Sequence, residues 1–188
     1  MAAARQLLRD KGFARTTARD LVAASNTNLA SIGYHFGSKE KLLYKAIEAE
    51  FAEWVEHVGR LAMSGDGTPL ERLAFAWATV RDTFPEHRAL LVAYIEAAAQ
   101  AERSTEVRAQ LAQHLASARR RIAEMVLAAM PSNSRVDEEQ AIAVASFLIA
   151  VCDGMALQWL FDPDALPPGA ALTAALAEGF TAALDPRP

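Results

Sequence analysis

The chain has 188 residues, of which 52% are hydrophobic and 22% are charged. This composition excludes an intrinsically disordered chain, and a chain of this length buries enough surface to fold without disulfides. Its single cysteine, Cys152, excludes an internal disulfide, and no uncharged apolar run approaches the roughly 18 residues of a membrane span. The first residues lack the apolar stretch of a secretion signal. We therefore expect a cytoplasmic protein with no membrane segment, no cofactor and no metal site.

The formal net charge of −4 is unevenly distributed along the chain. Residues 1–46 carry eight Lys or Arg and three Asp or Glu, whereas residues 47–188 carry 11 and 20. The first segment therefore has a net charge of +5 and the second a net charge of −9. A basic segment on an acidic chain favours nucleic-acid binding at the N-terminal end only. The alternative is a basic face that is merely solvated.

Prolines, glycines and polar capping residues divide the chain into helical segments, and no stretch has the alternation of a strand. Two segment starts, at Thr17 and Asp137, resemble capping boxes. The sequence thus predicts an all-α fold with a three-helix module over 1–46 and a larger helical domain over 47–188. The nine predicted helices span residues 2–11, 18–24, 29–35, 39–62, 69–83, 86–101, 105–129, 138–161 and 170–184.

The second and third predicted helices are short and lie on the basic segment. Asn26 stands between them, and Asn tolerates the left-handed backbone of a tight turn. Two short helices joined in this way describe a helix-turn-helix, whose second helix lies in the major groove of DNA. Ile32 and Phe36, four residues apart, form the apolar stripe that would hold this helix to the first two. The small residues Ala30 and Gly33 would allow close approach to DNA.

The run Asn28-Leu-Ala-Ser-Ile-Gly-Tyr-His-Phe-Gly-Ser-Lys-Glu-Lys-Leu42, preceded by Thr16-Thr-Ala-Arg-Asp-Leu-Val-Ala-Ala24, resembles the DNA-binding signature of the tetracycline-repressor (TetR) family. The resemblance implies phosphate or backbone contacts from Thr17, His35 and Lys39, and a groove-facing position for Ala30, Ser31 and Tyr34. The predicted partner is double-stranded DNA. The complete set of predicted DNA-binding residues is Thr17, Asn28, Ala30, Ser31, Gly33, Tyr34, His35 and Lys39.

The sequence also departs from the family pattern. Gly33 stands where many members carry a tyrosine, and Lys41 stands where an acid is common. The first helix begins late, without the residues that usually precede it in the family. Either the natural protein has a longer N-terminus than this sequence, or the short first helix reduces the affinity for DNA.

The predicted helices 138–161 and 170–184 are apolar on most faces. A helix of this kind is buried, here by its own domain and by a partner. Two such helices from each subunit would form a four-helix interface in a homodimer, which places two recognition helices over a palindrome. The alternative is the core of a monomer. The residues predicted for the dimer interface are Leu148, Cys152, Leu172, Leu176 and Phe180.

Large apolar residues within 69–161 have the composition of a small-molecule pocket, although ordinary cores share it. The TetR resemblance implies a small hydrophobic effector there. We therefore expect a ligand-responsive transcriptional repressor that its effector releases from a palindromic operator. The alternative is a helical ligand-binding protein with weakened or lost sequence-specific DNA binding. No set of residues typical of an enzyme is present. The predicted effector-binding residues are Trp77, Phe84, Tyr94, Met125, Phe147, Met155 and Trp159.

Overall fold

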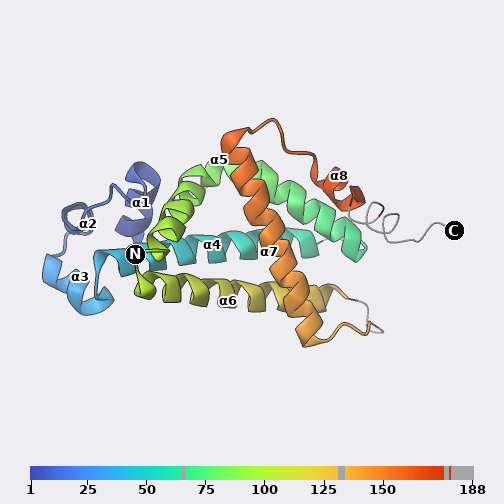
Figure 1. Ribbon diagram of the computed structural model, residues 1–188, viewed down its shortest axis with the longest axis horizontal. Coiled ribbons are helices and arrows are strands. Elements are labelled where there is room, and N and C mark those ends of the chain that lie inside the picture. The colour runs from blue at the N-terminus through green and yellow to red at the C-terminus, as the bar shows by residue number, and fades with distance from the viewer. Residues whose placement is uncertain (65–66, 131–133, 176–177, 179–188) are drawn as a thin grey trace. The chain divides into compact units, whose positions relative to one another are not determined.

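The computed structural model describes residues 1–64, 67–130, 134–175 and 178, and every regular element in these ranges is a helix (Figure 1). The predicted all-α fold class is therefore confirmed. The elements are α1 (Ala2–Lys11), α2 (Ala18–Ser25), α3 (Leu29–Phe36), α4 (Lys39–Met63), α5 (Pro69–Ala101), α6 (Thr105–Ala129), α7 (Glu138–Phe161) and α8 (Gly169–Ala174).

The chain divides into two compact units. The first consists of Met1–Trp54 and Glu86–Ala118, and the second of Val55–Pro85 and Arg119–Pro188. Helices α4, α5 and α6 each contribute residues to both units. The contacts thus group the chain differently from the predicted domains 1–46 and 47–188. That boundary remains a prediction about where DNA binding ends.

The predicted break before residue 86 is wrong, because α5 continues from Pro69 to Ala101 with Pro85 inside it. A proline inside a helix removes one backbone hydrogen bond and crowds the preceding turn, at a cost of about 3 kcal/mol. Burial on both sides of the proline offsets this cost. Phe84 is fully buried in the second unit, and Leu91 is 4% exposed in the first. Each large apolar side chain that is buried contributes about 1.5–3 kcal/mol.

The helix starts follow the predicted capping pattern. The Asp20 N–H donates to the Thr17 hydroxyl at 3.1 Å, and the Asp20 carboxylate accepts from the Thr17 N–H at 2.8 Å. Asp137 and Gln140 form the same reciprocal box at the start of α7. These side chains satisfy backbone N–H groups that have no partner within the helix.

The core of the first unit holds the three short helices against α4 (Figure 1). Leu21 of α2, Ile32 of α3 and Leu43 of α4 are at most 7% exposed and belong to one cluster. Phe36 packs on this cluster, so the predicted stripe of Ile32 and Phe36 is confirmed. The cluster fixes which side of α3 faces outward.

The core of the second unit is built on aromatic residues of α5 and α7. Phe84 and Trp159 lie with their ring centroids 5.5 Å apart. The start of α8 fits closely on α5, because a Cβ at Gly169 would lie 2.6 Å from the backbone nitrogen of Ala78. The predicted helix 170–184 thus begins at residue 169, and its positions 176, 177 and 179–184 lie outside the described residues.

Candidate nucleic-acid interface

The turn between α2 and α3 has the geometry of a helix-turn-helix. Asn26 adopts the left-handed conformation with φ 51°, and its N–H donates to the Val22 carbonyl. Asn28 then begins α3, because its side-chain oxygen accepts hydrogen bonds from the Ser31 N–H at 2.8 Å and the Ser31 hydroxyl at 3.1 Å. Asn28 and Ser31, both predicted to contact DNA, therefore also fix the first turn of α3.

The outward face of α3 gathers most of the predicted DNA-binding residues. Ala30, Gly33, Tyr34 and His35 are all exposed, and Tyr34 is 87% exposed. Thr17, at the start of α2, is exposed as well. An exposed side in this register is what a recognition helix presents to the major groove. The structure thus brings these residues together on one surface.

Lys39 has a position that the sequence did not indicate. Its ammonium donates to the Thr16 carbonyl at 3.0 Å and lies 3.3 Å from a carboxylate oxygen of Glu40. Lys39 therefore ties the start of α4 to the residue before the α2 cap. An ammonium has three donors, so the predicted phosphate contact is compatible with this bond.

Several basic residues of the first 46 positions are neutralised within the first unit. Arg5 pairs with Glu53 at 2.7 Å, and this hydrogen bond holds the pKa of the Glu53 carboxyl below its usual range. Lys11 pairs with Asp20, and Lys41 pairs with Glu106 on α6. The net charge of +5 therefore overstates the positive field that this surface offers to DNA.

Two exposed arginines flank the Thr17 cap, Arg15 on one side and Arg19 on the other. The Arg15 Nε–H donates to the Lys11 carbonyl at 2.9 Å. Phosphate contacts commonly come from such cations and from helix N-termini. The sequence prediction omitted both residues, and their position beside a capped helix start was the signal that could have found them.

The predicted effector-binding residues do not all lie in one unit. Trp77, Phe84, Met155 and Trp159 are at most 8% exposed in the core of the second unit. Met125 belongs to the same unit and is partly buried.

The other two predicted effector-binding residues lie elsewhere. Tyr94 belongs to the first unit, where its ring lies 5.2 Å from that of Phe51. Phe147 is 46% exposed on α7, an exposure typical of a surface position rather than an enclosed pocket. Effector binding by these two residues remains a prediction.

The predicted dimer residues also differ in their surroundings. Leu148, Cys152 and Leu172 are partly buried, whereas Leu176 and Phe180 lie outside the described residues. Trp77 donates a hydrogen bond to the Cys152 sulfur, and burial raises the pKa of this thiol to about 12. Cys152 thus packs on the core of its own unit, and its place in an interface remains a prediction.

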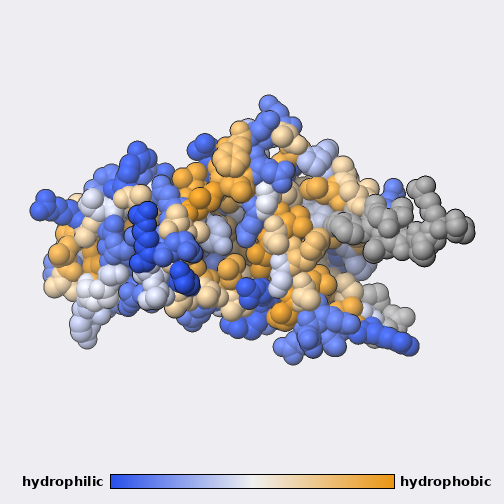
Figure 2. Space-filling model, in the orientation of Figure 1, coloured by the Kyte–Doolittle hydropathy of each residue, from blue (hydrophilic) through white to orange (hydrophobic). Residues whose placement is uncertain are grey.

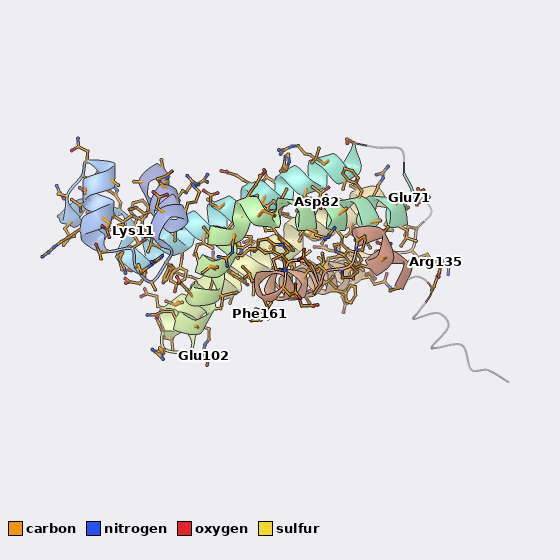
Figure 3. All side chains as sticks on the ribbon, turned by 90° about the horizontal axis from the view of Figure 1, so that it is seen from above. Lys11, Glu71, Asp82, Glu102, Arg135 and Phe161 are labelled. Atoms are coloured by element: carbon orange, nitrogen blue, oxygen red, sulfur yellow. The ribbon has the colours of Figure 1, made fainter. Side chains whose placement is uncertain are left out.

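The most exposed apolar residues of α7 lie on another face. Phe147, Leu157 and Phe161 are 46%, 44% and 81% exposed, and Phe161 is labelled at the end of α7 in Figure 3. Figure 2 shows apolar side chains exposed over this helix, which lies at the front of the view. Within the described residues, α7 is also the one helix long and apolar enough to cross a membrane, by length and composition alone. Asp153 in the middle of α7, and the hydrogen bond from Trp77 to the neighbouring Cys152, argue for a helix packed within the protein instead.

Two sequence models of protein families match the chain. The model described as bacterial regulatory proteins, tetR family, matches residues 1–46, and the model described as BetI-type transcriptional repressor, C-terminal, matches residues 69–185. None of the curated proteins matches the sequence significantly.

Solved structures with the same fold cover nearly the whole chain. A protein of Pseudomonas aeruginosa PAO1 described as a transcriptional regulator has a TM-score of 0.69 at 19% identity, covering 96% of this chain and 88% of its own. A TetR-like transcriptional regulator of Rhodococcus sp. RHA1 has a TM-score of 0.57 at 25% identity, covering 96% and 92%. The regulator FadR of Bacillus subtilis, in complex with stearoyl-CoA, has a TM-score of 0.62 at 13% identity, covering 94% and 93%.

Proposed function

Because this chain belongs to the TetR family of bacterial transcriptional regulators, we propose that it is a homodimeric repressor of a palindromic operator. A small hydrophobic effector bound in the second unit releases it from this DNA. The family consists of regulators rather than enzymes, as the sequence predicted. DNA as the partner implies that the protein works in the cytoplasm.

The observation that carries the DNA-binding role is the exposed face of α3 behind a left-handed turn. Ala30, Gly33 and Tyr34 of this face approach base edges in the major groove. Thr17 and Arg19, beside the N–H groups that begin α2, contact phosphates. These phosphate contacts supply affinity and position, and the α3 contacts supply specificity.

The exposed face of α7 supports the homodimer. Ala143, Phe147, Ala150, Gly154, Leu157 and Phe161 follow one another at intervals of three and four residues, as in the seam between packed helices. A Cβ at Gly154 would meet nothing within 4 Å, so no contact within the chain requires a glycine there. A second copy of α7 crossing at Gly154 would bury the neighbouring large side chains.

The second unit supports the sensing role. Its core contains the two buried tryptophans Trp77 and Trp159, and residues 69–185 match a repressor domain. FadR of Bacillus subtilis, which has the same fold, was solved with stearoyl-CoA. Helices α4, α5 and α6 belong to both units and can pass a change from one to the other. An effector acts only through its different affinities for the DNA-bound and released states.

Fluorescence anisotropy on the DNA upstream of the chain's own gene, with excess unrelated DNA as competitor, tests this function. Binding that survives the competitor and is lost in Tyr34→Ala supports it. Tyr34 is 87% exposed, so this variant should keep its fold. Equal affinity for all DNA sequences, with a strong dependence on salt, would instead favour a ligand-binding protein that has lost sequence-specific recognition. The same assay identifies effectors by release of the DNA.

A further inference from the structure

The recognition helix α3 contains no lysine or arginine. Its exposed side chains are the apolar Leu29 and Ala30 and the polar-tipped Tyr34 and His35. Leu29, the first residue of the helix, is 60% exposed and is absent from the core cluster of the first unit. Figure 1 shows α3 at the outer edge of this unit. Neither the packing of the unit nor the cap at Asn28 requires a leucine at this position.

Leu29 lies at the N-terminal end of α3, the end from which a recognition helix reads bases. Residues at the N-terminal end of such a helix contact base edges in the major groove. Guanine is read there by Arg or Lys and adenine by Asn or Gln, whereas the 5-methyl group of thymine is read by apolar contact. An exposed leucine at the start of a helix without Lys or Arg matches the thymine methyl.

Gly33 adds an independent observation. It lies one turn after Leu29 on the same side of α3, and a Cβ built on it meets nothing within 4 Å. The glycine is therefore not needed for packing inside the chain, although it weakens the helix. Without a side chain at this position, the first turn of α3 can come close to the floor of the groove.

We propose that Leu29 is a specificity-determining residue that packs against the 5-methyl group of a thymine in each operator half-site. The inference rests on the proposed DNA-binding function and adds the chemical class of base that this helix selects. The operator half-sites should accordingly contain an A·T pair at the position facing Leu29.

The test removes one methyl group at a time. Once a bound sequence is known, each thymine is replaced by uracil, which differs only in lacking the 5-methyl group. For the wild-type protein, one symmetric pair of positions should lose about fourfold in affinity per half-site, the worth of one buried methyl group. All other thymines should tolerate the replacement.

Variants assign this sensitivity to Leu29. Leu29→Ala should bind thymine and uracil equally at that position, and Leu29→Met, which keeps an apolar side chain, should retain the discrimination. Leu70→Ala, at a leucine that is 47% exposed on α5, is the matched control and should behave as wild type. Far-UV circular dichroism checks that each variant is folded.

Each remaining outcome is decisive. If Leu29→Ala keeps the full methyl sensitivity, or if no thymine position is sensitive in the wild type, Leu29 does not read thymine. Specific binding would then persist, and the proposed function would stand without this inference. Sequence-blind binding of the wild type would overturn both.

Discussion

Glu96 on α5 accepts a hydrogen bond from the backbone N–H of Ala14, in the loop between α1 and α2, over 2.9 Å. The two residues are 82 positions apart and belong to the same unit. On α6, Glu106 pairs with Lys41 in the first turn of α4. Carboxylates of α5 and α6 therefore hold the loop before α2 and the start of α4. In the proposed mechanism a bound effector would act through these contacts, because α5 and α6 also contribute residues to the second unit.

Replacing Glu96 by alanine should loosen the loop before α2. The Ala14 N–H loses its partner, and a hydrogen bond to a charged group contributes about 1.5–3 kcal/mol at most. We expect faster hydrogen exchange at Ala14 and weaker DNA binding. Glu96→Gln, which keeps an acceptor oxygen, should be milder, and Glu86→Ala on the exposed side of α5 is the control. Unchanged hydrogen exchange at Ala14 would show that the bond to Glu96 does not stabilise this loop.

Gly33→Ala should separate stability from DNA binding. Alanine favours a helix over glycine by about 1 kcal/mol, and the position has room for a Cβ. The free energy of unfolding, measured with urea, should therefore rise. Affinity for operator DNA should fall, because the added methyl group keeps α3 from the base edges. A variant that is more stable and binds DNA as tightly as wild type would show that no close approach occurs at this glycine.

The Lys11–Asp20 ion pair should make the stability of the first unit depend on acid. Hydrogen bonds from Lys11 and Thr17 hold the pKa of the Asp20 carboxyl well below its usual range. A carboxylate with a lower pKa in the folded chain stabilises it above the unfolded pKa of about 3.9, and this contribution is lost as the pH falls through the folded value. Wild type should therefore lose stability more steeply below about pH 4 than Asp20→Asn does.

Lys11→Ala provides the second arm of this experiment, because it removes the partner and leaves the carboxyl in place. This variant should also lose less of its free energy of unfolding than wild type as the pH falls below about 4. The effect of both variants should shrink at high salt, since Lys11 is exposed to solvent and Asp20 is partly exposed. Acid limbs that coincide for the wild type and both variants would contradict the role of this pair.

A charge on the exposed face of α7 should dissociate the proposed homodimer. Leu157 is 44% exposed in the single chain and lies beside Gly154 in the proposed seam. Leu157→Asp would bury a carboxylate without a partner in the interface, at a cost of several kcal/mol. Sedimentation equilibrium should find it monomeric. Leu127→Asp, at a leucine of α6 that is 38% exposed, should stay dimeric; a dimeric Leu157→Asp protein would exclude this face.

Local features of the fold were readable from the sequence, because each depends on residues a few positions apart. The boxes at Thr17 and Asp137 and the left-handed Asn26 are of this kind. The continuous α5 was not readable, since the local penalty of Pro85 is outweighed by burial that only the folded chain provides. The sequence shows the proline that destabilises the helix, but it does not show the burial that compensates for it.

The candidate site was predictable to the same extent. The α3 residues follow from one motif, and the structure places most of them on one exposed face. The bond from Lys39 to Thr16 and the pairing of Arg5 with Glu53 join residues 23 and 48 positions apart. No local pattern predicts contacts at such separations, so the charge available to DNA could be judged only from the three-dimensional structure. Which face of the apolar helix α7 stays exposed likewise depends on packing that only the folded chain shows.

Selection from a library of random DNA duplexes tests the central claim most directly. A homodimer that reads DNA with two copies of α3 should enrich one palindromic sequence, with half-site centres about one helical turn or a multiple of it apart. Two chains should bind each selected duplex. Enrichment of no sequence, or of a single half-site bound by one chain, would contradict the account of a dimeric, sequence-specific regulator.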